Sequence, residues 1–192
     1  MKRAAPIAVL VIVVVAVLGV AKGWWQGEED PVDPLPADTP IHWVNTTLWE
    51  FALSVPEPWS KTYRATHPDY VHFSGPKDDE FMPQLQFKWS KKEMKSAAWS
   101  EWNVTKFRNA PGYAVFDEGE ATVAGMPARY LVYGLKQKTP GTDDVVEYRT
   151  IDFYFAGHGH VGMLRGVSTA RTFLDTYRRL FTQIAHRLRY RG

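Results

Sequence analysis

His158 and His160 flank Gly159, and these two histidines have the residue type and spacing that could support chemistry. Side chains two positions apart in an extended strand point to the same side, so two imidazoles could bind zinc, copper or nickel. Two ligands leave a metal site incomplete, and the chain has no cysteine to add a thiolate. We therefore expect exposed histidines beside a glycine turn and no cofactor, with metal binding at His158 and His160 as the weaker alternative.

Sequence motifs of common enzyme classes are missing from the 192 residues. There is no phosphate-binding loop, nucleophile elbow, zinc-protease helix or dinucleotide fingerprint. The lack of cysteine also excludes disulfides, thioether-bound haem and a cysteine nucleophile. The sequence therefore predicts a non-enzymatic protein without a small-molecule substrate. A metal-dependent hydrolase stays open only if His158 and His160 converge with a carboxylate.

The C-terminal segment is rich in arginine and has a single acid between residues 171 and 191, Asp175. Such clusters steer and dock acidic partners, although a solvated surface and cations at a helix C-terminus would give the same pattern. Nucleic acid is not an expected partner, because an exported domain seldom meets it. The candidate partner-binding residues are Arg171, Arg178, Arg179, Arg187 and Arg189.

The chain contains eight tryptophans, and most of them should fill the core because each buries a large apolar area. Tryptophan is also enriched in binding hot spots. Any tryptophan that stands exposed is therefore a candidate interface anchor. The residues concerned are Trp43, Trp49, Trp59, Trp89, Trp99 and Trp102.

The N-terminal residues predict a membrane anchor. The run from Ala4 to Ala21 has no polar side chain, and as a helix it would span about 27 Å, close to the bilayer hydrocarbon thickness of about 30 Å. Lys2 and Arg3 precede it, which predicts a cytoplasmic N-terminus and a single pass through a bacterial inner membrane into the periplasm or another extracytoplasmic space. A cleaved signal peptide is the alternative, although no convincing cleavage site follows. The anchor residues are Ala4, Leu10, Val14 and Leu18, with Trp24 and Trp25 as the outer aromatic belt.

Three regions follow from this pattern: an anchor over residues 1–25, a linker over 26–40 and a folded extracytoplasmic domain over 41–192. The linker holds four prolines and five acids, a composition that favours an extended strut over a packed element.

Short strands dominate the expected domain. Apolar residues lie on both faces of the segment from Ala128 to Leu135, which indicates a central strand covered on both sides. The other expected strands span 48–55, 70–73, 85–89, 113–116, 120–123, 145–156 and 161–167, with turns at 125–127, 136–144 and 157–160. A helix is expected around 94–107 and a second one from about 168 to 189, with Phe173 and Phe181 on its buried side.

The order of these features resembles the PsbP-like family, the extrinsic proteins of photosystem II and related bacterial exported proteins. The similarity covers about residues 41–190. It rests on the segment FALSVPEPW at 51–59, the strand VAGMPARYLVY at 123–133, a late hairpin and the closing helix. The resemblance implies an α+β fold in which an antiparallel sheet is packed by helices, an α/β/α sandwich. It also implies a protein that binds other proteins, although a membrane anchor of its own distinguishes this chain from the photosystem protein.

These patterns together predict a membrane-anchored extracytoplasmic accessory subunit. Its partners would be the lipid bilayer and the other subunits of a larger membrane complex, of a photosynthetic or respiratory electron-transfer type. A stand-alone ligand-binding or sensor module of the cell envelope is the alternative, and an aromatic-lined pocket would favour it.

Overall fold

The computed structural model describes residues 41–63, 70–77, 81–138 and 143–192. The predicted anchor over 1–25 and linker over 26–40 lie outside this part of the chain. Among the described helices, none combines the length and the apolar character that crossing a bilayer requires.

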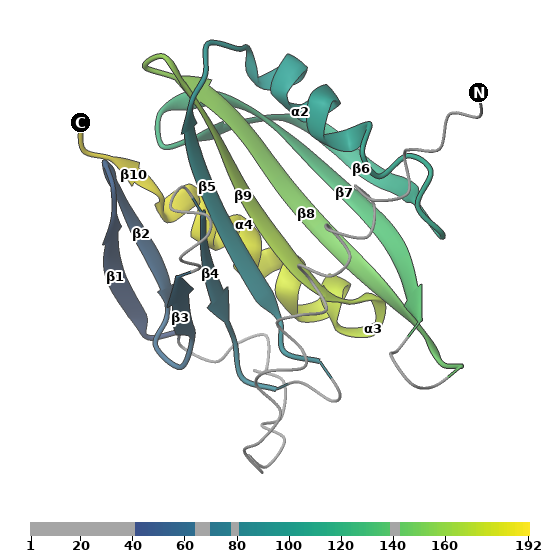
Figure 1. The fold of residues 1–192 in the computed structure, drawn as a ribbon. Helices are drawn as coiled ribbons and strands as arrows, with labels where there is room; N and C mark the ends of the chain where they lie inside the picture. The colour runs from purple at the N-terminus through teal and green to yellow at the C-terminus, as the bar shows by residue number, and fades with distance from the viewer. Residues whose placement is uncertain (1–40, 64–69, 78–80, 139–142) are drawn as a thin grey trace, which may run out of the picture. The chain divides into compact units, whose positions relative to one another are not determined.

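The described residues form a seven-stranded antiparallel sheet with the strand order β3-β4-β5-β9-β8-β7-β6 (Figure 1). The segment expected to be a central strand is part of β7, which lies between β6 and β8. The two strands expected over 113–116 and 120–123 are one strand, β6, with an irregular register between Val115 and Asp117. The strands are β3 (Ser60–Tyr63), β4 (Tyr70–Ser74), β5 (Gln84–Lys91), β6 (Ala114–Val123), β7 (Met126–Lys138), β8 (Val145–Gly157) and β9 (His160–Thr169).

A second, three-stranded sheet has the order β1-β2-β10, with β1 at Trp43–Leu48, β2 at Phe51–Pro56 and β10 at Arg189–Tyr190. The expectation of one strand over 48–55 is wrong in its boundaries, because a tight turn after Leu48 separates β1 from β2. Trp49 occupies this turn with a positive φ of 51°, a conformation that only a minority of non-glycine residues adopt.

Two hairpins of the large sheet close through two-residue turns in which both residues have positive φ. These are Ala124 and Gly125 between β6 and β7, at 53° and 78°, and His158 and Gly159 between β8 and β9, at 53° and 73°. Positive φ at both central positions is the conformation that matches the right-handed twist of paired strands. The turn expected at 157–160 is confirmed, but a histidine takes one of the positions that favour glycine.

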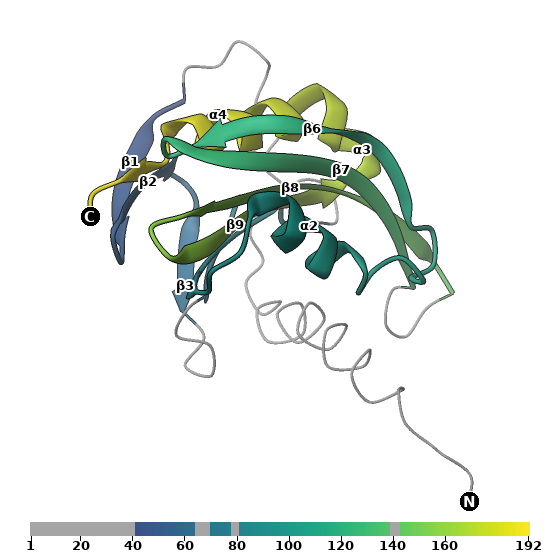
Figure 2. The same cartoon turned by 90° about the horizontal axis from the view of Figure 1, so that it is seen from above.

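Helices cover both faces of the large sheet (Figure 2). On one face lies α2 (Ser96–Val104), against β7 and β8. On the other face lies the closing helix, which consists of α3 (Ala170–Thr172), a π-helical turn η1 (Phe173–Tyr177) and α4 (Arg178–Arg187). The closing helix is shorter than expected, because β9 continues to Thr169 and Leu188 leaves the helix with extended backbone angles.

Each face of the sheet has its own hydrophobic core. Val132 of β7 belongs to the core under α4, whereas its neighbours Leu131 and Tyr133 belong to the smaller core under α2. This alternation confirms that the central strand is covered on both sides. Gly166 of β9 allows close packing against α4, because a Cβ atom there would lie 2.2 Å from the ring of Phe181.

Candidate functional site

A row of polar residues crosses the face of the sheet that carries α2. His72 of β4, Gln86 of β5, Arg165 of β9 and Asp152 of β8 follow one another as register partners on adjacent strands. His72 is 6% exposed, Gln86 4% and Asp152 0%. Buried polar side chains are costly unless they are hydrogen-bonded, so a whole row of them marks this face of the sheet as unusual.

Asp152 and Arg165 form the centre of this row. Arg165 donates from Nε to Asp152 Oδ1 and from Nη2 to Asp152 Oδ2, each at 2.7 Å. The hydroxyl groups of Tyr133, at 3.2 Å, and of Tyr154 also donate to Oδ2. The carboxylate is therefore saturated by partners within the domain.

The tyrosines beside Asp152 remain protonated to strongly alkaline pH. Burial raises the pKa of Tyr133 and of Tyr154 far above the ordinary value; Asp152 adds to both shifts and Arg165 opposes them. Burial alone would lower the pKa of Arg165, but Asp152 and the tyrosines raise it well above its usual value. The guanidinium of Arg165 and the hydroxyl groups of Tyr133 and Tyr154 therefore keep their protons near neutral pH.

Two tryptophans of α2 form a rigid stack above this network. Trp99 is 2% exposed, and its Nε1 donates to Gly162 O of β9 at 2.9 Å. Trp102, one helical turn later, stacks on it with the ring centroids 5.2 Å apart and an interplanar angle of 15°. Trp102 is 44% exposed. The buried ring thus holds an exposed ring in place.

Two lysines lie over the exposed ring. The Nζ atom of Lys106 is 3.3 Å from the ring centroid of Trp102, and that of Lys92 is 4.3 Å from it. Within the described residues neither ammonium forms an ion pair with a carboxylate. We call this group of Lys92, Trp102 and Lys106, of which Trp102 and Lys106 are exposed and Lys92 is half-buried, the α2 patch.

The surroundings of Lys106 destabilise the charged form of its ammonium group. Burial of part of its side chain and then the charges of Lys88, Arg165 and Lys92 lower its pKa from 10.5 to about 8. Lys106 therefore lies within the electrostatic influence of three other cationic side chains, of which Arg165 is paired with Asp152.

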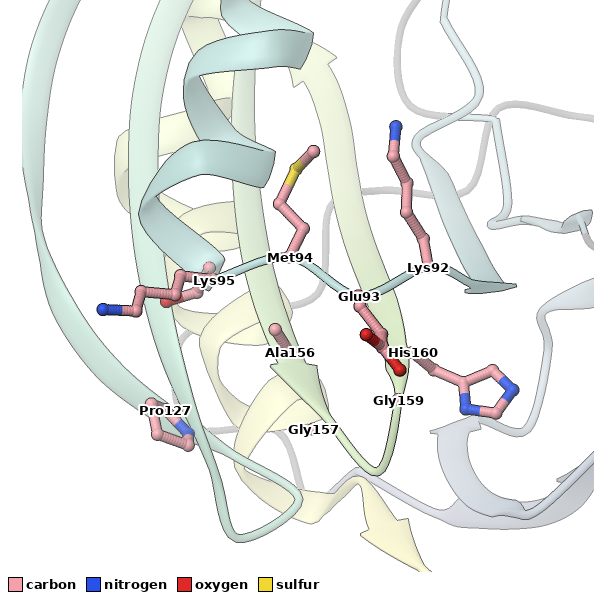
Figure 3. Close-up of a pocket in the computed structure, with 10 residues that line it drawn as sticks. Lys92, Glu93, Met94, Lys95, Pro127, Ala156, Gly157, Gly159 and His160 are labelled. Carbon is pink, nitrogen blue, oxygen red and sulfur yellow. The ribbon is translucent and has the colours of Figure 1, made fainter.

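A pocket of about 560 Å³ adjoins the α2 patch at Lys92. It lies between the segment that leads into α2 and the turn between β8 and β9. In Figure 3, Lys95 and Pro127 lie on one side of this pocket and His160 on the other. Its lining is mixed, with the apolar side chain of Met94 beside charged and glycine positions.

The two candidate metal ligands pack on different aromatic rings. His160 stacks on Trp89 with the centroids 4.9 Å apart, and its Nδ1 lies 2.7 Å from His158 O. His158 stacks on Tyr190 at 4.3 Å. Across the described ranges, no group of three or more His, Asp or Glu side chains is arranged to hold a metal ion. The convergence with a carboxylate that a metal-dependent hydrolase would need is therefore not found in this part of the chain.

The candidate arginines of the closing helix do not form one cluster. Arg178 pairs with Asp117 of β6, and Arg187 lies over the ring of Trp43, 4.4 Å from its centroid. Arg189 donates from Nη1 to the carbonyl oxygen of Leu188 at 3.0 Å and to that of His186, which caps the helix end. Arg171 and Arg179 are exposed on the same helix. A docking role for these arginines stays a prediction.

Sequence reasoning singled out Trp102 as a conditional interface anchor, but it did not predict the residues around it. Gln86 and Lys88 are polar at alternate positions of β5, which marks a polar face of that strand. The spacing of Trp99 and Trp102 places both on one side of a helix. Nothing in the sequence brings Lys106 close to Lys88, because that proximity depends on how α2 crosses the sheet.

No protein family model matches the chain, and no curated protein matches it in sequence. Solved structures do share its fold. CyanoP, the cyanobacterial PsbP of Synechocystis, has a TM-score of 0.54 at 11% identity and covers 84% of this chain and 99% of its own. LpqN, described as involved in cell envelope biogenesis of Mycobacterium tuberculosis, has a TM-score of 0.54 at 15% identity. It covers 83% of this chain and 90% of its own.

A third structure, the Pseudomonas aeruginosa protein PA94 of unknown function, has a TM-score of 0.52 at 14% identity and covers 79% of this chain and 99% of its own. The resemblance to the PsbP-like family is thus confirmed at the level of fold. At these identities the likeness carries no function from one protein to another.

Proposed function

We propose that this protein is a non-enzymatic accessory subunit that docks on a larger membrane protein complex through the α2 patch. In this proposal the N-terminal segment anchors the chain in a bacterial inner membrane and the domain lies on the extracytoplasmic side. A photosynthetic or respiratory electron-transfer complex is the class of assembly that we propose as the partner.

The observation that carries this proposal is the exposed ring of Trp102 on the buried ring of Trp99. A large aromatic side chain held in one orientation loses little conformational freedom when a partner covers it. Tryptophans of this kind are the residue type most enriched among interface hot spots. Trp102 therefore has the properties of a preformed anchor.

The charges around Trp102 define the partner further. Lys92 and Lys106 lie over the ring without a carboxylate partner among the described residues, so a partner surface rich in Asp or Glu would pair with them. Complementary charge speeds association and fixes orientation. The arginines of the closing helix lie on the opposite face of the sheet. In this proposal they would either contact a second partner surface or take no part in docking.

The names of the structural neighbours agree with this setting. CyanoP is a cyanobacterial PsbP and LpqN is involved in cell envelope biogenesis. Both are consistent with a domain that works outside the cytoplasm, which is where the predicted topology places it.

The test compares full-length variants in membranes of the native host. Wild type, Trp102→Ala and Leu174→Ala carry a C-terminal affinity tag and are extracted with a mild detergent. Leu174 is the matched control, since it is an exposed apolar residue, 66% exposed, on the opposite side of the sheet. We expect wild type and Leu174→Ala to co-purify with a multi-subunit membrane assembly and Trp102→Ala to lose it. A wild-type chain that migrates only as a monomer would contradict the proposal.

A stand-alone ligand-binding or sensor module is the second candidate. The pocket beside Lys92 gives it a place for a ligand, but this is not the aromatic-lined pocket expected from the sequence for that function, since no Phe, Tyr or Trp of the described residues lines it. That function predicts saturable binding of a small molecule with no co-purifying assembly. The same extraction experiment separates the two functions, because the accessory role requires the assembly and the sensor role does not.

A further inference from the structure

We propose that the free edge of β1 is a self-association surface, at which β1 pairs antiparallel with β1 of a second copy of this chain about a twofold axis. The two small sheets then join into one continuous sheet across the contact. This surface is a different part of the domain from the α2 patch, and the inference does not depend on the docking role proposed above.

The outer side of β1 has no strand partner in the described part of the chain. β1 pairs with β2 alone, and the order of the small sheet is β1-β2-β10. Figure 1 shows β1 at the outer left of the domain. An edge strand presents backbone N–H and C=O groups that can pair with another chain. With six residues, β1 has the length of an ordinary sheet strand.

The other described sheet edges are protected against pairing in ways that β1 is not. The register of β6 is irregular near Asp117, and the strand also carries Glu118 and Glu120. β3 has four residues and contains Lys61, and β10 has two and contains Arg189. Short length, bulges and charged side chains are the devices by which natural sheets prevent edge-to-edge pairing. β1, with the sequence WVNTTL, has no charged side chain, no proline and no bulge.

The composition of β1 favours a second copy as its partner. When a strand pairs with itself about a twofold axis, each charged side chain comes close to its own copy, and like charges that face each other destabilise the contact. β1 carries no charge that would oppose this pairing. Its aromatic and β-branched residues are the types that pack well across strands, and these are Trp43, Val44, Thr46 and Thr47.

The hairpin between β1 and β2 fixes which backbone groups face outward. A two-residue turn joins the strands, and the register partners Leu48 and Phe51 flank it. In such a hairpin the flanking pair is hydrogen-bonded, and hydrogen-bonded and non-hydrogen-bonded pairs then alternate along the ladder. Leu48, Thr46 and Val44 therefore bond to β2 through their backbone groups.

The remaining residues of β1 direct their backbone N–H and C=O groups to the free edge. They are Trp43, Asn45 and Thr47. The twofold register that uses all three places Asn45 opposite Asn45 of the second copy, and Trp43 opposite Thr47 of the second copy. It also places Val44 opposite Thr46 of the second copy, as a pair without backbone hydrogen bonds. Since Val44 is 45% exposed, pairing covers an exposed apolar side chain.

Hydrogen bonds on both faces of β1 hold its edge in a preformed geometry. Ser54 Oγ donates to Asn45 Oδ1 at 2.6 Å, and Lys61 Nζ donates to Thr46 Oγ1 at 3.0 Å. Asn45 and Thr46 are consecutive residues of a strand, so their side chains point to opposite faces. A strand that is already ordered loses little conformational freedom when it pairs.

Disulfide mapping tests the contact and its register. The chain has no cysteine, so each introduced thiol is the only one. Full-length Val44→Cys and Thr46→Cys, with tags of different size, are reconstituted together in proteoliposomes and oxidised. In the proposed register their Cα atoms lie about 4.5 Å apart, whereas two copies of the same variant lie on a diagonal of about 7–8 Å. We expect the mixed disulfide in about fivefold excess over either symmetric one, because the longer distance is poor for a disulfide.

The matched control for the mapping is Glu120→Cys, an exposed position on β6, which is also an edge strand. It should form little disulfide under the same conditions. If it forms disulfides as fast as the mixture of Val44→Cys and Thr46→Cys, random collisions explain the products and the proposal is wrong. Mixed and symmetric disulfides in statistical proportion would also overturn it, because no fixed register would then exist.

A proline at the free edge tests the backbone hydrogen bonds of the contact. Thr47→Pro removes an outward N–H, and edge strands tolerate proline at such positions, so the domain should stay folded. Energy transfer between labelled full-length copies, at a series of protein-to-lipid ratios, measures self-association. We expect Thr47→Pro to weaken it about tenfold or more, since both copies lose a hydrogen bond. The matched control, Thr47→Ala, keeps the N–H and should change it about twofold or less.

Thermal unfolding verifies that both Thr47 variants are folded before they are compared. A folded Thr47→Pro protein that associates as tightly as wild type would overturn the proposal. An equal loss in Thr47→Pro and Thr47→Ala would also overturn it, because the backbone N–H would then have no role. If Thr47→Pro does not fold, the outward direction assigned to this N–H is wrong, and the proposed register is wrong with it.

Discussion

Asp152 and Arg165 face each other on β8 and β9 and form a two-point ion pair in which both donor–acceptor distances are 2.7 Å. Asp152 is 0% exposed and the side chain of Arg165 15% exposed. Burial removes the hydration of both charges, and their mutual attraction offsets this desolvation penalty. If one partner is removed, the penalty of the remaining buried charge is no longer offset and the fold is destabilised.

Removing the cation from this pair should destabilise the domain strongly. We expect Arg165→Met to lower the free energy of unfolding by about 3–5 kcal/mol, because Asp152 is left buried without its partner. Urea denaturation of the full-length protein in detergent measures the change. The control is Arg129→Met, which breaks the exposed pair with Glu118 and should cost about 1 kcal/mol or less. Equal losses in the two variants would contradict the assigned role.

Stability should increase with pH in the window where Lys106 loses its proton. The pKa of Lys106 is about 8 in the folded protein, and its ordinary value, expected in the unfolded chain, is 10.5. Between these values the unfolded chain binds the proton and the folded chain does not, so the folded state gains stability as the pH rises. Comparing wild type with Lys106→Gln between pH 7.5 and pH 9.5 isolates the effect, because the variant should lack this slope. An identical pH dependence of both proteins would exclude the lowered pKa.

The two stacked tryptophans should respond differently to the same substitution. Trp99→Phe removes the hydrogen bond to Gly162 O and leaves that buried carbonyl without the indole, which should cost about 1–3 kcal/mol. Trp102→Phe changes an exposed ring and should cost about 0.5 kcal/mol or less. Thermal unfolding of both variants checks this order, and a larger loss for Trp102→Phe would be inconsistent with Trp99 as the support.

The close approach of β9 to α4 depends on the missing side chain at Gly166. A Cβ atom there would lie 2.2 to 2.5 Å from ring atoms of Phe181, so Gly166→Ala should destabilise the domain by about 1–3 kcal/mol. Adding Phe181→Leu should recover part of that loss, because it removes the atoms in conflict. A double-mutant cycle with no coupling between the positions would contradict this packing.

The sequence predicted much of the fold because alternation and helical spacing follow directly from burial. Apolar residues on both sides of β7 indicated its central position, and the apolar stripe through Phe173 and Phe181 indicated a helix on the sheet. The turn at Trp49 was missed because it contains none of the residues that commonly mark a tight turn. The π-helical turn at Phe173–Tyr177 was missed because its spacing is close to that of an α-helix.

The candidate site was less predictable because it depends on contacts between distant segments. Trp102 could be named in advance only as one of several tryptophans, since its exposure depends on the packing of Trp99 beneath it. Lys106 and Lys88 belong to different elements, and the effect of Lys88 on Lys106 depends on how α2 packs on β7 and β8. The arginines of the closing helix drew attention by their number, yet Arg178 and Arg187 pack against the domain itself.

Site-specific photo-crosslinking in intact membranes tests the docking role of the α2 patch most directly. A photoreactive phenylalanine analogue replaces Trp102 in one full-length protein and Leu174 in another, and the crosslinked products are identified by mass spectrometry. The account predicts that position 102 crosslinks to a subunit of a membrane complex at a surface rich in Asp and Glu, and that position 174 does not. Crosslinking from neither position, or the same products from both, would contradict it.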